Sequence, residues 1–485
     1  MEGGSEHLSV KVRTRGNRRP ALLAERGAPF GLRFIMPLAL GATLNPINST
    51  MIATALVPIA ADFHASVAET GWLIAGLYLT SAVAQPTMGR LADLFGARRV
   101  YLGSLSLVAL AGVIGTRASS LGMLIAVRVV LGIGTSGAYP ASMRIFRTQG
   151  DQLGVPPPRV ALSVLSLAGV STSAVGPLLG GIMTSYFGWH SIFTINLPLA
   201  LVTIVMALLW TPKDEPLQGG FSRTWTELDW VGIELFATFL LSLMLFLMNF
   251  SRRQWLALSV AIVCAGALVL HSLWCSQPFI DVRMLVRNRP LTATYVRIAA
   301  IVLVVYCVIY GFAQWLESAA GFDSTEAGLI TLPMSVVAAI ASLIGGRTKS
   351  IRTSFFISMF ASLLGCTGLY LIDHNTPVWL IAASVSMFGL PTGLASTATQ
   401  TAVYMQAPAD KMGTASGLQR TATYIGAITS MSLLGAMYGS HATDSGLHSL
   451  AIVMGVVTTL LLVATLFDRT LPRSAILTIQ PKGRS

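Results

Sequence analysis

The sequence predicts an all-α polytopic membrane protein, and three observations lead to this class. Hydrophobic residues make up 53% of the 485 residues and charged residues only 11%, with a mean hydropathy of +0.69. Soluble domains carry about 25% charged residues, so a bilayer must surround most of this chain. Long apolar segments recur from residue 34 to residue 467, and Lys and Arg collect in alternate connections between them.

Fourteen of these segments are long enough to cross a membrane as helices. A span needs about 20 mostly apolar residues to cross roughly 30 Å of hydrocarbon. Only residues 251–254 separate the seventh segment from the eighth. The predicted spans are 34–60, 70–88, 100–116, 121–142, 160–186, 191–210, 230–250, 255–275, 291–317, 326–345, 353–372, 378–404, 412–438 and 447–467.

The distribution of basic residues orients these spans. With the amino terminus in the cytoplasm, 26 of the 32 Lys and Arg residues fall in cytoplasmic segments, three in outer loops and three within spans. This asymmetry follows the positive-inside rule, and one missed span would invert every later loop. We therefore expect both termini in the cytoplasm and the protein in the plasma membrane, or in the inner membrane of a Gram-negative cell. The net charge of +12 then reflects membrane orientation and not binding to nucleic acid.

The order of the spans predicts two six-helix bundles that are joined by two linker helices. The loop GGRTKSIR at 345–352 resembles a degraded copy of the loop GRLADLFGARR at 89–99, as expected for an internal repeat. The predicted divisions are a basic cytoplasmic tail at 1–33, a bundle at 34–210, a linker region at 211–290, a second bundle at 291–467 and a cytoplasmic tail at 468–485.

The loop at 89–99 combines glycines with charges in a short connection. Glycines permit close approach of two backbones, and Asp93 and the neighbouring arginines can form ion pairs where two bundles meet. We therefore expect a conformational latch at this membrane face. The alternative is a positively charged cytoplasmic loop without a special role. The latch residues are Gly89, Arg90, Asp93, Gly96, Arg98 and Arg99.

This loop resembles the signature loop between spans 2 and 3 of the major facilitator superfamily of transporters. Further stretches resemble elements of its fourteen-span drug:proton antiporters, in the same order along the chain. The resemblance implies a secondary active transporter in which two bundles rock around a site near the bilayer midplane. It implies proton-coupled export of small amphipathic organic compounds, as in multidrug efflux. The stretches are RVVLGIGTSG (128–137), GVSTSAVGPLLGG (169–181), GWHSIFTINLP (188–198), GFDSTEAGLITLP (321–333) and GTASGLQRTATYIG (413–426).

Span 5 contains a proline within a group of glycines. A proline removes a backbone donor and kinks a helix, whereas small residues allow two helices to pack closely. The functional interpretation is a bend between the two halves that controls the outward-facing state, and the alternative is close packing alone. The residues concerned are Gly176, Pro177, Gly180 and Gly181.

Span 1 and span 4 carry polar residues at membrane depth. Asn45, Asn48 and Ser49 share one helical face, which we expect to line a cavity because lipid-exposed amides are costly. The antiporter pattern has an Asp where this chain has Asn48, and Asn cannot exchange a proton. Arg128 is a buried cation in span 4, and the resemblance implies that it couples protonation to substrate occupancy. The alternative is an arginine that only pairs with backbone carbonyls or reaches the interface.

The later spans add polar stripes at helical spacing. Glu317, near the outer end of span 9, is the first candidate for proton coupling, followed by Asp93 and Arg128. The alternative for Glu317 is an ordinary interfacial carboxylate. Because the spans hold three arginines, with Glu234 and Glu317 as acids and Glu326 only at the edge of one span, we expect neutral, zwitterionic or anionic amphipathic substrates. The predicted cavity residues are Asn45, Asn48, Ser49, Arg128, Tyr306, Tyr310, Gln314, Thr399, Gln400 and Arg420.

Other function classes lack their motifs. The chain has no HExxH or GxSxG sequence and no Walker loop, which disfavours an enzyme or an ATP-driven pump. An organic-anion uptake or facilitator carrier without proton antiport stays open, as does a sensor or channel built on a transporter fold. We expect a monomer whose partners are the lipid bilayer, a small-molecule substrate and protons. No cofactor or metal is expected, and the four cysteines are expected to be inert buried thiols.

Overall fold

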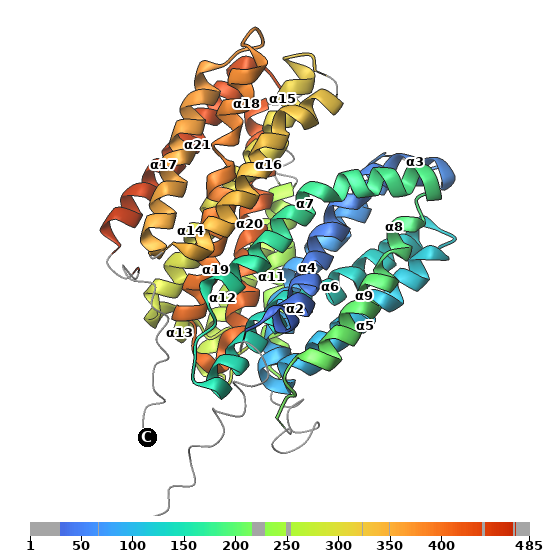
Figure 1. Cartoon of the computed structure of the whole chain (residues 1–485), viewed down its shortest axis with the longest axis vertical. Coiled ribbons are helices and arrows are strands. Elements are labelled where there is room, and N and C mark those ends of the chain that lie inside the picture. The colour runs from blue at the N-terminus through green and yellow to red at the C-terminus, as the bar shows by residue number, and fades with distance from the viewer. Residues whose placement is uncertain are drawn as a thin grey trace, which may run out of the picture.

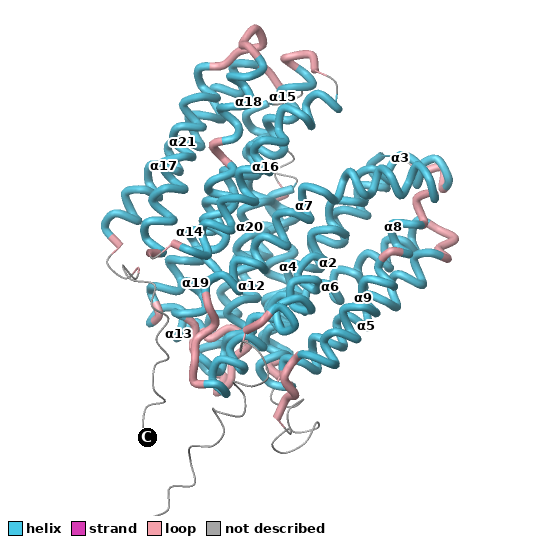
Figure 2. Tube along the Cα trace, viewed as in Figure 1, coloured by secondary structure: helices cyan, strands magenta, loops and turns pink. Residues whose placement is uncertain are grey.

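The structure, a computed structural model, describes residues 30–65, 67–215, 228–248, 254–322, 324–348, 350–438, 442–468 and 471. Within these residues the ordered elements are helices joined by loops (Figure 2). Each of the fourteen predicted spans contains at least one helix. Ten helices of the described chain are long and apolar enough to cross a membrane. The other four predicted spans fall on helices α2, α4, α7 and α20.

The first group of helices, called here the N-terminal bundle, packs around buried side chains such as Leu38, Tyr101 and Phe146. The hydroxyl of Tyr101 donates a hydrogen bond to the carbonyl of Pro37 (2.5 Å), which ties the third span to the first. The bundle consists of α2 (Leu32–Met51), η1 (Ile52–Ala55), α3 (Leu56–Asp62), α4 (Val67–Phe95), α5 (Ala97–Thr116), α6 (Leu121–Leu153), α7 (Arg159–Phe187), α8 (Ser191–Thr194) and α9 (Asn196–Trp210).

The last group of helices, the C-terminal bundle, has its own core around Phe312, Trp315 and Phe355. Two of its helices are interrupted by π-helical turns, η3 and η4. The bundle consists of α14 (Arg289–Tyr306), η3 (Cys307–Phe312), α15 (Ala313–Ser318), α16 (Ser324–Arg347), α17 (Ile351–Leu371), α18 (Val378–Ser386), η4 (Pro391–Ala395), α19 (Ser396–Gln406), η5 (Ala409–Lys411), α20 (Met412–Tyr438) and α21 (Asp444–Phe467).

The linker region forms α11 (Trp230–Met248), α12 (Trp255–Trp274) and α13 (Val282–Arg287). Asp229 ties these elements together because its carboxylate accepts hydrogen bonds from the backbone of Gly232 and Phe279 and contacts His271 (2.7 Å). Ligand atoms of Asp229, His271 and Cys275 lie within 4.8 Å of one another. Both carboxylate oxygens of Asp229 already have partners in the protein. These bonds, which connect α11 to the chain after α12, explain why the three side chains lie close together.

Four of the long helices begin with a side-chain cap. A side-chain oxygen before the first turn satisfies a backbone N–H that has no partner inside the helix. Ser120, Asn288, Ser350 and Thr443 accept such a hydrogen bond at the starts of α6, α14, α17 and α21. Gly154 ends α6 with a positive φ of 67°, a conformation that favours glycine.

The two bundles converge at one end and diverge at the other. Figure 1 shows α3 and α8 apart from α15 and α18 at the top, while α4, α7, α19 and α20 approach each other below. The bundles meet mainly through the pairs α4 with α20 and α7 with α16. We call the end that contains residues 89–99, 144–159 and 409–415 the closed end, and the opposite end the far end.

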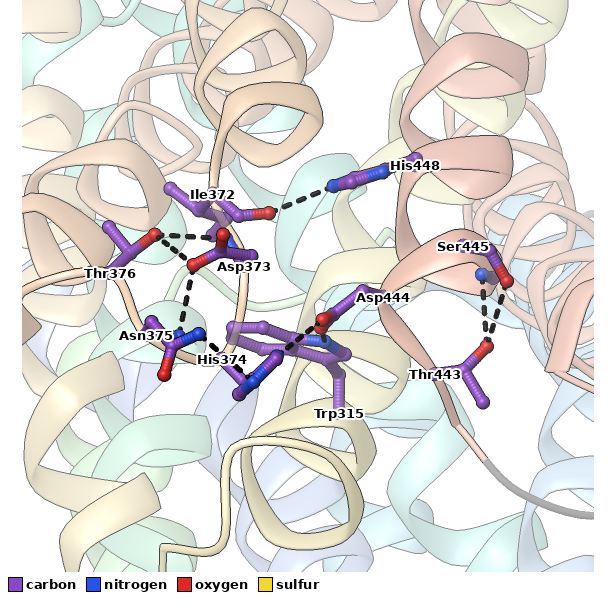
Figure 3. A network of polar contacts seen from close by, with 11 residues as sticks. Trp315, Ile372, Asp373, His374, Asn375, Thr376, Thr443, Asp444, Ser445 and His448 are labelled. Carbon is purple, nitrogen blue, oxygen red and sulfur yellow. Dashed lines mark hydrogen bonds and ion pairs between the residues drawn. The ribbon is translucent and has the colours of Figure 1, made fainter.

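At the far end, polar contacts join elements within each bundle. In the C-terminal bundle, Asp444 accepts a hydrogen bond from the indole of the fully buried Trp315 (2.8 Å) and contacts His374 (2.7 Å; Figure 3). In the N-terminal bundle, the indole of Trp189 donates to Asp62 (2.5 Å). Each bond joins the first span of a bundle to its last, so each bundle is braced as a separate body.

Candidate substrate cavity and closed end

A cavity of about 360 Å³ lies between the two bundles. Its wall is contributed by both halves, since Asn45 comes from α2 and Arg420 from α20. The polar lining residues are Asn45, Ser49, Thr50, Tyr78, Ser166, Tyr306, Tyr310, Thr331, Ser335, Thr392, Ser396, Gln400, Gln419, Arg420, Thr423 and Tyr424.

Six of the predicted cavity residues line this space, and four do not. The six are Asn45, Ser49, Tyr306, Tyr310, Gln400 and Arg420. Asn48 and Arg128 lie inside the N-terminal bundle, Thr399 is fully buried, and Gln314 is exposed beyond η3. The side chain of Glu317 lies outside the described residues.

Asn48 and Arg128 are held by bonds within the N-terminal bundle. The side chain of Asn48 exchanges two hydrogen bonds with Asn196 of α9 (2.6 and 3.0 Å). The guanidinium of Arg128 donates to the carbonyls of Leu73 and Asn48 (2.8 Å each). The prediction that these two residues face the cavity is therefore wrong, because each finds partners on neighbouring spans. Arg128 is paired with carbonyls, as the alternative interpretation held.

The predicted stripe on span 9 fails at its outer end for a geometric reason. Tyr306 and Tyr310 line the cavity, but the π-helical turn η3 (Cys307–Phe312) inserts extra residues into the helical turn. This changes the helical phase and rotates Gln314 away from the stripe. On span 12, Gln400 faces the cavity and Thr399 does not, because adjacent helical residues point about 100° apart.

Several lining residues were missed by the sequence reasoning. Tyr78 of α4 and Gln419 of α20 lie in the wall, as do Thr331 and Ser335 of α16. A usable signal existed for the last two, since they are polar, stand four residues apart and interrupt an apolar span. Tyr78 had no comparable signal, because a single tyrosine within a span is equally compatible with packing.

Asn45 joins the two bundles at the cavity. Its amide donates to Ser81 (3.2 Å) and Thr135 (3.0 Å) of the same bundle, and its oxygen accepts the hydroxyl of Tyr424 (2.9 Å) from the other. Gln85 of α4 also donates to the Tyr424 hydroxyl (3.1 Å). Tyr424 therefore connects the cavity wall of α20 to two spans of the N-terminal bundle.

At the closed end, Asp93 caps a helix of the opposite bundle. Its carboxylate accepts hydrogen bonds from the backbone N–H groups of Gly413 and Thr414 (2.8 Å each) and from the Thr414 hydroxyl (2.9 Å). These groups belong to the first turn of α20, where a negative charge is favourable. Arg144 of α6 lies 3.6 Å from the same carboxylate. The loop residue that the sequence singled out thus lies on the contact between the bundles.

Glycines make this contact possible. A Cβ atom on Gly89 would lie 2.1 Å from the carbonyl oxygen of Gly413, and one on Gly413 would lie 2.3 Å from that of Gly89. One turn further along, a Cβ on Gly417 would meet the backbone of Gln85 at 2.5 Å. Helices α4 and α20 therefore touch backbone to backbone.

The other charges of the loop have partners in their own bundle. The backbone N–H groups of Arg98 and Arg99 donate to Asp214 (3.0 and 2.8 Å), which caps α5. Gly96, with a φ of 100°, begins that helix beside the same carboxylate. The expectation that Arg98 and Arg99 pair with Asp93 between the bundles is wrong, since their guanidinium groups donate to backbone carbonyls of their own half of the chain, those of Leu208, Phe95 and Glu215. Arg90 is buried.

The glycines of span 5 serve close packing. A Cβ on Gly176 would lie 1.8 Å from the hydroxyl of Thr50, and one on Gly180 would lie 2.6 Å from the carbonyl of Met51. Gly181 faces open space. Helix α7 runs without a break from Arg159 to Phe187, and the side chain of Pro177 lies outside the described residues. These contacts join α7 to span 1 of its own bundle.

Comparisons with known proteins identify the family. The family model described as Major Facilitator Superfamily matches residues 38–431 and 298–484. The chain belongs to the major facilitator superfamily. It is therefore a multi-pass membrane transporter, and both the resemblance drawn from its motifs and the predicted fold class are confirmed. The number of membrane crossings stays a prediction.

Curated relatives and a solved structure agree with this assignment. The uncharacterized MFS-type transporter YwoD of Bacillus subtilis is 32% identical over 84% of this chain and 91% of its own. The multidrug efflux pump LfrA of Mycolicibacterium smegmatis is 26% identical over 83% and 79%. The structure of the proton:xylose symporter XylE superposes with a TM-score of 0.62 at 14% identity, covering 89% of this chain and 95% of XylE, and shows the same fold.

The closed end of this transporter is expected to respond to pH through Asp93, which lies beyond the predicted span 70–88. Burial raises the pKa of its carboxyl from 3.8 to about 6, although Arg144 and the bonds from Thr414 and Gly413 act against the rise. A carboxyl with a higher pKa in the closed arrangement than in water stabilises that arrangement at low pH, and the stabilisation is lost as pH rises through about 6. We therefore expect the closed population to grow between pH 7 and pH 5.

Spin labels on either side of the closed end would measure this population in reconstituted protein. Asp93→Asn, which has no titratable proton, is the matched variant and should give a profile that is flat over this interval. A closed population that falls on acidification, or an equal response in Asp93→Asn, would contradict the assignment to Asp93.

Proposed function

We propose that this transporter exports small amphipathic organic compounds by alternating access, in exchange for protons. The observation that carries the proposal is a polar cavity between two separately braced bundles. Among the described residues, the hydrogen bonds between the bundles lie at the cavity and between the cavity and the closed end, which contains the charged loop. Asp93 on the amino end of α20, together with the glycine contact of α4 and α20, would hold that end shut. If the closed end opened while the far end closed, access to the cavity would switch from one side of the membrane to the other.

The arrangement corresponds to an outward-facing state if the closed end is cytoplasmic. The positive-inside distribution supports that orientation, because the closed end carries the basic loops. Export rather than uptake is supported by the similarity to the multidrug efflux pump LfrA over most of both chains. We place the protein in the plasma membrane as a monomer. Of the two acids that are candidates for proton coupling, Asp93 is the one whose side chain the structure describes.

The test is dye efflux from energised cells that express the protein. We expect cells loaded with amphipathic dyes of negative, zero and positive charge to lose at least one dye faster than cells with an empty vector. A protonophore should abolish the difference, because it removes the proton gradient that drives exchange. Faster accumulation of the dye would indicate the organic-anion uptake carrier instead. Efflux that persists unchanged with the protonophore would exclude proton antiport.

A non-transporting sensor or a channel is distinguished with purified protein in liposomes. A carrier shows counter-flow, in which unlabelled dye on one side accelerates entry of labelled dye from the other. A channel passes dye without counter-flow, and a sensor passes none. Either result would overturn the proposal.

A further inference from the structure

We propose that the cavity binds organic anions, with a carboxylate or sulfonate of the ligand on Arg420 and an aromatic body among the cavity tyrosines. This inference rests on the proposed function and names the class of substrate that the same cavity would carry. It narrows the expectation from the sequence, which left neutral, zwitterionic and anionic compounds open.

Among the described residues, Arg420 has no partner for its hydrogen-bond donors. It lines the cavity, and its guanidinium lies over the ring of Tyr139 at 3.9 Å. Stacking on a ring leaves the edge of the guanidinium and its N–H groups free. No hydrogen bond or ion pair joins Arg420 to the described part of the chain, and its Nε is buried without a partner. The N–H groups of a guanidinium without a protein partner are arranged in a plane, and they match the two oxygens of a carboxylate or sulfonate group.

The other two arginines within spans already have hydrogen-bond partners in the protein. Arg297 pairs with Asp468 at 2.8 Å, and Arg128 donates to two backbone carbonyls. Neither of them lines the cavity. Arg420 differs from both because it lines the space between the bundles and has neither a hydrogen bond nor an ion pair among the described residues. A partly buried cation without a counter-charge is costly, and an anionic ligand would remove that cost.

The rest of the wall suits an aromatic anion better than an aromatic cation. Among the described lining residues there is no Asp or Glu, so a cation would meet Arg420 without a compensating charge. Tyr306 packs against Tyr310 with ring centroids 5.6 Å apart, and Tyr78 against Tyr424 at 6.0 Å. These rings offer flat apolar surface together with hydroxyl donors. The π-faces attract cations weakly, but the full charge of Arg420 opposes them in the same small space.

The test compares two dyes that share a xanthene core and differ in charge. Fluorescein is an anion at pH 7.5, and rhodamine 6G is a cation. Binding to the purified full-length protein in nanodiscs is measured by fluorescence polarisation. We expect fluorescein to bind at least about tenfold more tightly than rhodamine 6G, and Arg420→Gln to weaken fluorescein binding by about tenfold or more, the usual consequence of losing a charge-assisted bond. Arg420→Lys should keep the preference for fluorescein, since it keeps the charge.

Arg117→Gln is the matched control, because Arg117 is exposed at the end of α5 and does not line the cavity. It should bind both dyes as the wild type does, and thermal unfolding shows whether each variant is folded. Equal fluorescein binding by the wild type and a folded Arg420→Gln would overturn the inference, and so would a preference of the wild type for rhodamine 6G. If fluorescein binds through Arg420 but is not transported in liposomes, the anion site is supported and the proposed export is refuted. If rhodamine 6G is transported and fluorescein is not, the proposed export is supported and the anion site is refuted.

Discussion

Gly89→Ala is expected to abolish most transport while leaving the cavity able to bind its ligand. The new methyl group would lie 2.1 Å from the carbonyl oxygen of Gly413, 2.5 Å from its carbon and 2.9 Å from the backbone nitrogen of Thr414. All three atoms belong to the backbone and cannot rotate away, so α4 and α20 would have to separate. Overpacking of this kind costs roughly 1–3 kcal/mol, which lowers the ratio of closed to open protein by about five- to 150-fold.

The measurement is the transport rate in liposomes, together with label distances across the closed end. Gly413→Ala is the reciprocal variant and should behave alike, because its methyl group would lie 2.3 Å from the carbonyl of Gly89. Gly103→Ala is the control, since nothing lies within 4 Å of a Cβ at Gly103. Wild-type transport by Gly89→Ala would show that the cycle does not pass through this contact.

Arg297→Ala is expected to lower the free energy of unfolding more than any other substitution proposed here. The guanidinium of Arg297 lies 2.8 Å from the carboxylate of Asp468, and the two side chains are only 5% and 12% exposed. It also lies 5.0 Å from the centre of the Phe355 ring. The substitution removes the cationic partner of a largely buried carboxylate, and breaking a buried ion pair from one side costs about 3–5 kcal/mol. The midpoint of thermal unfolding in detergent should fall accordingly.

A double variant separates the ion pair from the space that it fills. In Arg297→Met with Asp468→Leu, both charges are replaced by apolar groups, and such replacements are often neutral or stabilising. We expect this variant to recover most of the stability lost in Arg297→Ala. A double variant as unstable as the single one would show that the charge pair is not the source of the loss. Arg117→Ala, an exposed substitution, should unfold as the wild type does.

The sequence predicted the helices and the closed-end contact because their signals are local. Apolar length and the absence of charge select spans for a bilayer, and glycine marks a place where backbones can touch. Gly89 and Asp93 were found in this way, and the structure places both against α20. Asn45 and Arg420 were found because a polar group in a span needs a partner or a cavity.

The predictions from the sequence were wrong where two alternative partners were available to the same residue. Asn48 carries the same signal as Asn45, yet Asn196 of α9 satisfies it inside the bundle. Arg98 and Arg99 stand beside Asp93 in the loop, but Asp214, more than a hundred residues later, caps their helix. Spacing along a helix cannot decide between partners that folding brings from distant spans.

The sequence alone determined that this chain is a membrane protein, which segments form its long helices, which superfamily it resembles and which loop of the first half contacts the second, because hydropathy, charge and glycine act over short distances. Tertiary structure decided which polar groups face the cavity. That choice depends on helical phase, which the π-turn η3 alters, and on long-range pairing, which leaves Arg420 unpaired while Arg128 and Arg297 find partners. The preference for anions that we propose follows from the one arginine of these three that has no hydrogen bond or ion pair in the described part of the chain.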